Sequence, residues 1–76
     1  MYAVVRRDVS TPYGMSFFTG GMKLSRYEDG DIAYQLDMSV DPTEAFQFFG
    51  YREPADFVRL LGSEDEFDIV DMNEVC

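Results

Sequence analysis

Carboxylates are the side chains of this sequence that could do chemistry, because its 76 residues include 15 Asp and Glu, one Cys and no His. The absence of His excludes Ser-His-Asp and Cys-His nucleophilic systems, histidine general bases and most transition-metal sites. Paired carboxylates could instead support hydrolysis, or bind Ca²⁺ or Mg²⁺. The two densest acidic runs are Glu28-Asp29-Gly30-Asp31 and Glu64-Asp65-Glu66.

Neither acidic run has the pattern of a catalytic or metal site. The first is too compressed for a helix-loop-helix calcium loop, which needs alternating oxygen ligands and a distant Glu. Its Asp29-Gly30 centre is typical of a hairpin turn. The second run is typical of a solvated acidic loop, although it could hold a loosely bound divalent ion. A chain of this length leaves little room for an active-site cleft, so we expect a protein that is not an enzyme, with no catalytic residue, metal site or cofactor.

The charge is distributed unevenly along the chain, which has a net charge of −9 at pH 7. Residues 1–27 carry four basic residues and one acid, a net charge of +3, whereas residues 28–76 carry two Arg and 14 acids, a net charge of −12. Such a field repels nucleic acid and attracts a basic surface. We therefore expect a basic protein partner and no direct binding to DNA or RNA.

The composition indicates one folded domain over residues 1–76. Hydrophobic residues make up 46% of the chain and include seven Phe and five Tyr, which argues against disorder. The single Cys, Cys76, rules out an internal disulfide and favours a reducing compartment. The apolar run before Arg6 and Arg7 is too short for a signal peptide, and no stretch approaches a membrane span. We expect a soluble, cytoplasmic protein that does not bind a membrane.

Two strands are predicted near the N-terminus. Met1–Arg7 is apolar on both faces until its two arginines, a pattern typical of a strand in the centre of a sheet. Met15–Thr19 is a short aromatic strand, which Gly20-Gly21 follows as either a tight turn or a bulge. The same glycine pair lacks the downstream Lys and the strand-to-helix context of a phosphate-binding loop.

The Asp29-Gly30 pair predicts a hairpin, because extended segments flank it on both sides. Before it, Met22 and Leu24 alternate with Lys23 and Ser25. After it, apolar residues occupy alternate positions of the strand and are predicted to form a half-buried face: Ile32, Tyr34, Leu36, Met38 and Val40.

Residues 41–50 and 53–62 repeat one pattern of acid, Pro, small, acid, two apolar residues, one polar residue, two apolar residues and Gly. The acid and Pro favour the start of a helix, and the Gly is typical of a left-handed cap at its end. Two short helices are therefore predicted, docked on the sheet because neither is long enough to be stable alone. The alternative is that Ala45–Phe49 forms a strand.

The closing segment, Phe67–Met72, is the last predicted strand. Val70 breaks its alternation, which leaves a bulge or a second buried face as alternatives. The predicted fold is α+β, with a mostly antiparallel sheet of about four strands, two short helices packed on one face, and the order β-β-β-α-α-β. If the last strand pairs with the first, the two ends of the chain lie in one sheet.

The acidic side chains are the first candidate binding surface. Glu64, Glu66 and Asp68 alternate along an extended chain, ~6.6 Å apart on one face, and Asp71 and Glu74 continue the run. The predicted partner-binding residues are Glu28, Asp29, Asp31, Glu64, Asp65, Glu66, Asp68, Asp71 and Glu74. Such a surface either keeps a small domain soluble or imitates a nucleic-acid backbone and occupies the basic channel of a nucleic-acid-binding protein.

In its size and in the acids from Glu28 to Glu74, the chain resembles the small phage-encoded inhibitors of bacterial defence, the anti-CRISPR and anti-restriction proteins. Several of these are acidic DNA mimics. The resemblance implies that the target is the nucleic-acid channel of a CRISPR effector or a restriction complex, in the host cytoplasm. Basic residues in the first third of the chain depart from a uniformly acidic mimic and indicate a two-signed surface: Arg6, Arg7, Lys23 and Arg26.

The alternative function is a structural or regulatory protein-interaction module, either a monomer or a homodimer. Its contacts would be exposed aromatic side chains, because tyrosines are frequent binding hot spots at interfaces. The candidates are Tyr13, Phe17, Phe18, Tyr27 and Tyr51.

Overall fold

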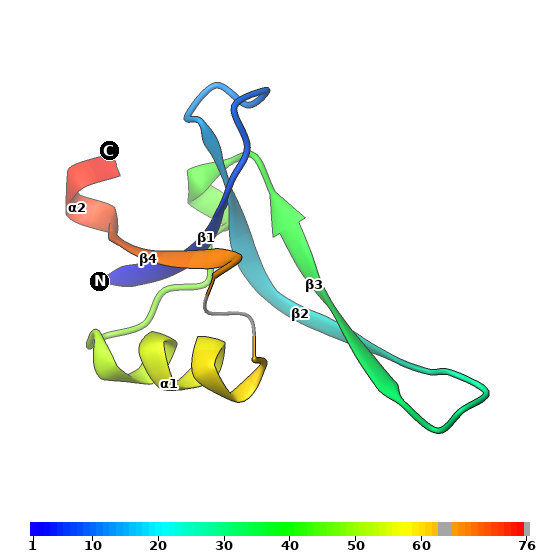
Figure 1. Cartoon of the computed structure of the whole chain (residues 1–76). Coiled ribbons are helices and arrows are strands. Elements are labelled where there is room, and N and C mark those ends of the chain that lie inside the picture. Colours follow the sequence, from blue (N-terminus) through cyan, green and yellow to red (C-terminus); the bar gives the residue numbers. More distant parts are fainter. Residues whose placement is uncertain (63–64, 76) are drawn as a thin grey trace.

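The structure is a computed structural model that describes residues 1–62 and 65–75. It contains a four-stranded antiparallel sheet of order β3-β2-β1-β4, a nine-residue helix, a 3-10 turn and a short C-terminal helix, as Figure 1 shows. The elements are β1 (Tyr2–Arg7), β2 (Met15–Arg26), β3 (Ile32–Ser39), η1 (Pro42–Glu44), α1 (Arg52–Leu60), β4 (Phe67–Asp71) and α2 (Met72–Val75). The predicted α+β class is confirmed.

Strand β1 lies inside the sheet, between β2 and β4, as its apolar pattern predicts. Ala3, Val4 and Val5 are all buried. Because successive side chains of a strand point to opposite faces, Val4 enters one hydrophobic cluster with Phe18, Val58 and Phe67, while Ala3 and Val5 enter another. One strand therefore supplies the core on both sides of the sheet.

The last strand pairs with the first, from Tyr2 opposite Asp71 to Arg6 opposite Phe67, without a register shift. Val70 packs against the cluster that contains Ala3, so the break in alternation reflects a second buried face and not a bulge. The first and last strands thus lie side by side in one sheet, and α2 follows the last strand (Figure 1).

The hairpin predicted at Asp29-Gly30 is confirmed. The Gly30 N–H donates to the Tyr27 carbonyl at 3.0 Å, and the Tyr27 N–H donates to the Asp31 carbonyl at 2.8 Å. Gly30 has a φ of +90°, which other residues rarely adopt. The Asp29-Gly30 pair is therefore explained by the geometry of the turn.

Strand β2 continues through Gly20-Gly21, and the glycine pair forms a bulge. Phe18 lies opposite Met38 and Met22 lies opposite Leu36, so four steps along β2 match only two along β3. Gly20 has a φ of +100°. A bulge increases the local twist and bends the strand, and β2 leaves β1 at this point.

The first predicted helix is reduced to the turn η1. The Asp41 side chain caps it as the sequence indicates, but Ala45–Phe49 does not continue it. Instead, the Phe46 N–H donates to the Phe18 carbonyl at 2.7 Å, and Phe48 and Tyr2 exchange two hydrogen bonds of 2.7 and 2.8 Å. The bend of β2 leaves the edge of β1 open at Tyr2, and pairing there replaces helical hydrogen bonds.

The second predicted helix is α1, and its left-handed cap at Gly62, with a φ of +68°, is confirmed. The prediction that both helical segments pack on one face is wrong. Val58 of α1 joins the cluster around Val4, whereas Ala45, at the end of η1, joins the cluster around Ala3 on the other face. The extended segment after Ala45 carries the chain from one face to the other.

Candidate functional site

The β2–β3 hairpin extends well beyond the rest of the molecule. Figure 1 shows its outer part, residues 22–36, as a two-stranded arm with no helix on either side, and the molecule measures 43 Å along its longest axis. We call residues 22–36 the arm and the remainder the body. An isolated two-stranded ribbon is only marginally stable in water.

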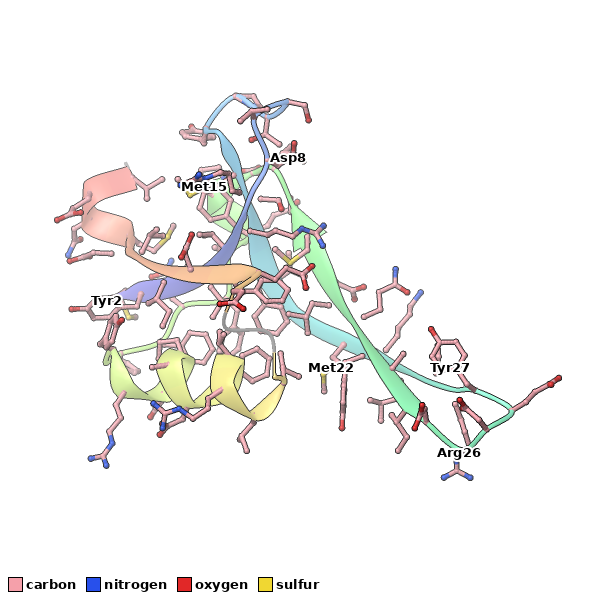
Figure 2. The ribbon with its side chains drawn as sticks, viewed as in Figure 1. Tyr2, Asp8, Met15, Met22, Arg26 and Tyr27 are labelled. Carbon is pink, nitrogen blue, oxygen red and sulfur yellow. The ribbon has the colours of Figure 1, made fainter. Side chains whose placement is uncertain are left out.

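Cross-strand register assigns each arm residue to a face. Met22 lies opposite Leu36, Leu24 opposite Tyr34 and Arg26 opposite Ile32, and directly opposed residues of antiparallel strands share a face. The second face carries Lys23 opposite Gln35 and Ser25 opposite Ala33. In Figure 2, Met22 and Arg26 point to one side of the arm and Tyr27 to the other. The apolar arm face therefore consists of Met22, Leu24, Ile32, Tyr34 and Leu36.

The apolar arm face is largely exposed to solvent. Leu24 is 63% exposed and Ile32 and Tyr34 are each 51% exposed. The face is continuous with the core, because Leu36 and Met38 pack against the cluster that contains Phe18. Helix α1 covers that inner part and ends at Leu60. Beyond this point the apolar side chains of Met22, Leu24, Ile32 and Tyr34 are about half exposed or more.

A pocket of about 160 Å³ lies where the apolar arm face meets the body. Tyr34 and Leu36 line it from the arm, and Leu61 and Phe67 line it from the body. Its polar rim contains Arg6 and Glu66, whose side chains form an ion pair with Nη1 and Oε1 3.4 Å apart. The pocket gives the apolar arm face a concave end, suited to a side chain of a binding partner.

The bulge fixes how the arm leaves the body. A Cβ added to Gly20 would lie 2.8 Å from Cδ2 of Phe46, and one added to Gly21 would collide with the Asp37 carboxylate. The Thr19 hydroxyl also donates to the Asp37 carbonyl at 3.1 Å. Gly20 is therefore required by its positive φ and by the Phe46 ring, and Gly21 leaves room for the Asp37 side chain at the junction between arm and body.

The predicted acidic residues form two separate groups. Glu28, Asp29 and Asp31 lie at the tip of the arm, and the others lie on the body, on β4, on α2 and in the residues just before β4 (Figure 1). In the second group are Asp65, Glu66, Asp68, Asp71 and Glu74, while Glu64 lies outside the described residues. The acids thus do not form one continuous face.

Several exposed acids serve as local caps of the backbone. Hydrogen bonds from the Thr43 hydroxyl, at 2.7 Å, and from the Thr43 N–H, at 2.9 Å, hold the pKa of the Asp41 carboxyl below its ordinary value. The Ser10 hydroxyl, at 2.6 Å, and the Ser10 N–H likewise lower the pKa of Asp8, with a smaller contribution from Arg6. These two carboxylates stabilise the turns in which they lie.

Within residues 1–62 and 65–75, no group of three or more Asp, Glu or Cys side chains is arranged to hold a metal ion. No helix in the same part of the chain is long and apolar enough to cross a membrane.

The aromatic residues predicted as exposed contacts do not converge on one surface. Phe17 and Phe18 are buried, so their assignment as contacts is wrong. Tyr13 packs edge-on against Phe17 and Tyr51 against Tyr2, at distant places on the body. Tyr27 lies on the arm, but it points away from the apolar arm face.

Sequence reasoning missed the exposure of Met22, Leu24, Ile32 and Tyr34, the last two of which it placed on a half-buried face. The difference in strand length could have revealed this exposure, since β2 has 12 residues and β1 has six. Strand β1 pairs with only the first residues of β2, so the rest of the hairpin must extend past the sheet. Comparison of this chain with protein-family models, with curated proteins and with solved structures finds no match.

Proposed function

We propose that this protein is a non-catalytic binding protein that docks its arm into an apolar groove on a basic partner protein. The observation that carries this proposal is the apolar arm face, which continues the core of the body and lies open to solvent. Contiguous exposed apolar surface on a small domain is typical of a protein-binding site. The pocket at the base of the arm supplies the matching concave feature.

Burial of this face favours binding through the hydrophobic effect. A fully exposed Leu, Ile or Met side chain contributes about 1.5–3 kcal/mol when it becomes buried, and those on the arm are about half exposed. A projecting ribbon also reaches into a groove that the body itself could not enter. The arm is therefore expected to be the centre of the interface, with polar residues at its rim.

The charge of the chain favours a basic partner. The arm has two basic and three acidic residues, a net charge of −1, so the body carries −8 of the total of −9. The tip acids and the acids near Glu66 lie at the two ends of the apolar arm face. A groove bordered by Lys and Arg complements this pattern, whereas a second copy of the chain would bring like charges together.

If the basic partner is a nucleic-acid-binding protein, this domain would act as its inhibitor. The partner's basic channel would then hold the acidic body in place of phosphate groups. The size and charge that the chain shares with anti-CRISPR and anti-restriction proteins support this reading. The separation of the acids into two groups favours apolar docking of the arm, with charge attraction as the second contribution.

A pair of neighbouring substitutions tests the proposal. Leu24→Asp places a charge on the apolar arm face, and Ser25→Asp places the same charge on the opposite face of the same strand. Quantitative capture of host proteins with wild type and both variants, followed by titration of the purified partner, measures the effect. We expect Leu24→Asp to weaken binding by about tenfold or more, and Ser25→Asp to bind nearly as wild type does.

Added salt and competing DNA then identify the partner class. Binding that weakens with salt indicates a basic partner, and displacement by duplex DNA indicates a nucleic-acid channel. Equal capture by both variants would overturn the role of the arm. A wild-type dimer in sedimentation that Leu24→Asp dissociates would show that a second copy covers the face, and it would overturn the proposed partner.

A further inference from the structure

Strand β4 forms an edge of the sheet, with no strand on its outer side in the described chain. The Met72 N–H donates to the Met1 carbonyl at 2.8 Å, and backbone groups of an antiparallel strand alternate in direction. Val70 and Asp68 therefore direct their backbone groups toward β1, and Ile69 and Phe67 direct theirs outward. The two hydrogen bonds between Tyr2 and Phe48, on the opposite side of β1, fit the same alternation.

A groove of about 240 Å³ runs beside this edge, between β4 and α1. Its helical wall consists of Tyr51, Ala55, Val58 and Arg59, of which the first three lie four and three residues apart and so share one side of α1. Phe67, Asp68 and Ile69 line the strand side. The volume is below the ~300–1,000 Å³ of small-molecule sites, and it suits one or two side chains of a peptide.

Charged and apolar side chains of β4 lie on opposite faces of the sheet. Asp68 lies opposite Val5, so its side chain lies on the face of the sheet away from α1. Phe67 and Ile69 lie on the α1 face. A strand added beside β4 would therefore meet, on one face, a groove lined by apolar side chains and Arg59, and on the other face the Asp68 carboxylate.

We propose that the β4 edge binds an extended peptide segment of a partner protein as a fifth strand, with apolar and basic residues alternating along the segment. Its apolar side chains would enter the groove beside α1, and its Lys or Arg side chains would face Asp68. Backbone hydrogen bonds to Ile69 and Phe67 would supply affinity, and the alternation would supply specificity. This site is separate from the arm and does not depend on the proposed function.

A second copy of the chain is a poor occupant of this edge. Pairing of two β4 strands would bring Asp68 and Asp71 of both chains together, where like charges are destabilising. A basic segment has the opposite relation to the same carboxylates. The negative charge of the edge therefore favours a basic peptide over a second copy of the chain.

The probe is a short capped peptide in which Val and Lys alternate, titrated into the ¹⁵N-labelled full-length protein. We expect amide shifts centred on β4 and α1, and slowed hydrogen exchange at the Ile69 and Phe67 N–H groups. Two control peptides contain the same residues in separate blocks, or Glu in place of Lys, and both should bind about tenfold more weakly or worse. No slowed exchange at Ile69 with saturating Val-Lys peptide would overturn the proposal.

Two substitutions locate the contact. Asp68→Lys should reverse the preference, so that the Val-Glu peptide binds better than the Val-Lys peptide, while Glu28→Lys makes the same charge change at the arm tip and should leave the preference unchanged. Ala55→Trp should fill the groove and weaken binding of both peptides. Equal effects of Asp68→Lys and Glu28→Lys would show a response to net charge alone. Concentration-dependent protection of Ile69 without peptide would show that a second copy occupies the edge; either result would overturn the proposal.

Discussion

The arm and the body use the same sheet in opposite ways. In the body, β1 is covered on both faces, and its side chains enter two hydrophobic clusters. In the arm, β2 and β3 continue with the same alternation of apolar and polar residues, but the apolar face is open to solvent. The body carries almost all of the net charge and the arm almost none. The body therefore provides stability and an electrostatic field, and the arm provides an apolar surface.

The contrast between body and arm is clearest along the paired strands β2 and β3. Phe18 opposite Met38 and Leu24 opposite Tyr34 are equivalent cross-strand pairs on one face. The first pair is covered, because the Phe57 ring of α1 stacks on Phe18 with centroids 5.1 Å apart. The second pair lies beyond the end of α1. Apolar alternation thus produces core or exposed surface according to whether another element reaches it.

The largest expected effect follows from truncation in the body. Phe17 is 0% exposed, and Phe17→Ala should cost about 3–5 kcal/mol of unfolding free energy. This is a large share of the roughly 4–11 kcal/mol expected for a domain of this size. Leu24→Ala, on the same strand but in the arm, should change stability by only about 0.5 kcal/mol. Urea unfolding followed by circular dichroism measures both, and similar losses would show that the arm is covered in solution.

The next effect concerns the junction of arm and body. Gly20→Ala places a Cβ against the Phe46 ring and holds a non-glycine residue at a φ of +100°. We expect a loss of about 1–3 kcal/mol. Gly50→Ala is the matched control, because its added Cβ meets nothing within 4 Å and Gly50 has no positive φ. A neutral Gly20→Ala would mean that the bulge does not set the direction of the arm.

Elements with local signals could be predicted from the sequence. The turn at Asp29-Gly30 needs only a glycine with positive φ, and α1 needs only its apolar stripe and the glycine at its end. Strand β1 is identified as central because its apolar residues leave no polar face for solvent. These predictions depend on short-range physics, and the structure confirms them.

Features that depend on distant partners could not be predicted in this way. Ala45–Phe49 has helical spacing, but open backbone groups at Phe18 and Tyr2 compete for it, and they are far away in sequence. The exposure of the apolar arm face could not be predicted for the same reason, since alternation assigns Leu24 and Tyr34 to a face without revealing what covers that face. The candidate site therefore emerges from tertiary structure, and only its charge could be read from composition.

The smallest expected effect concerns Asp41, an acid of the body that caps a turn. The pKa of Asp41 is lowered in the folded state by hydrogen bonds from Thr43, so the stabilisation by this carboxylate is complete above its ordinary pKa of 3.8. It is lost as the pH falls through the lowered folded value, because the protonated carboxyl is a weaker acceptor. The stability difference between wild type and Asp41→Ala should therefore be constant near neutral pH and shrink in acid.

Thr43→Val separates this cause from general charge effects. Without the hydroxyl donor, the pKa of Asp41 should rise toward its ordinary value, while that of Asp8, which depends on Ser10, should stay lowered. Carboxyl chemical shifts followed through an acid titration measure both groups in one experiment. If both pKa values move together, the acids of the body respond to one shared field; if Asp41 alone moves, its role is a local cap, and it is removed from the set of carboxylates available to attract a basic partner.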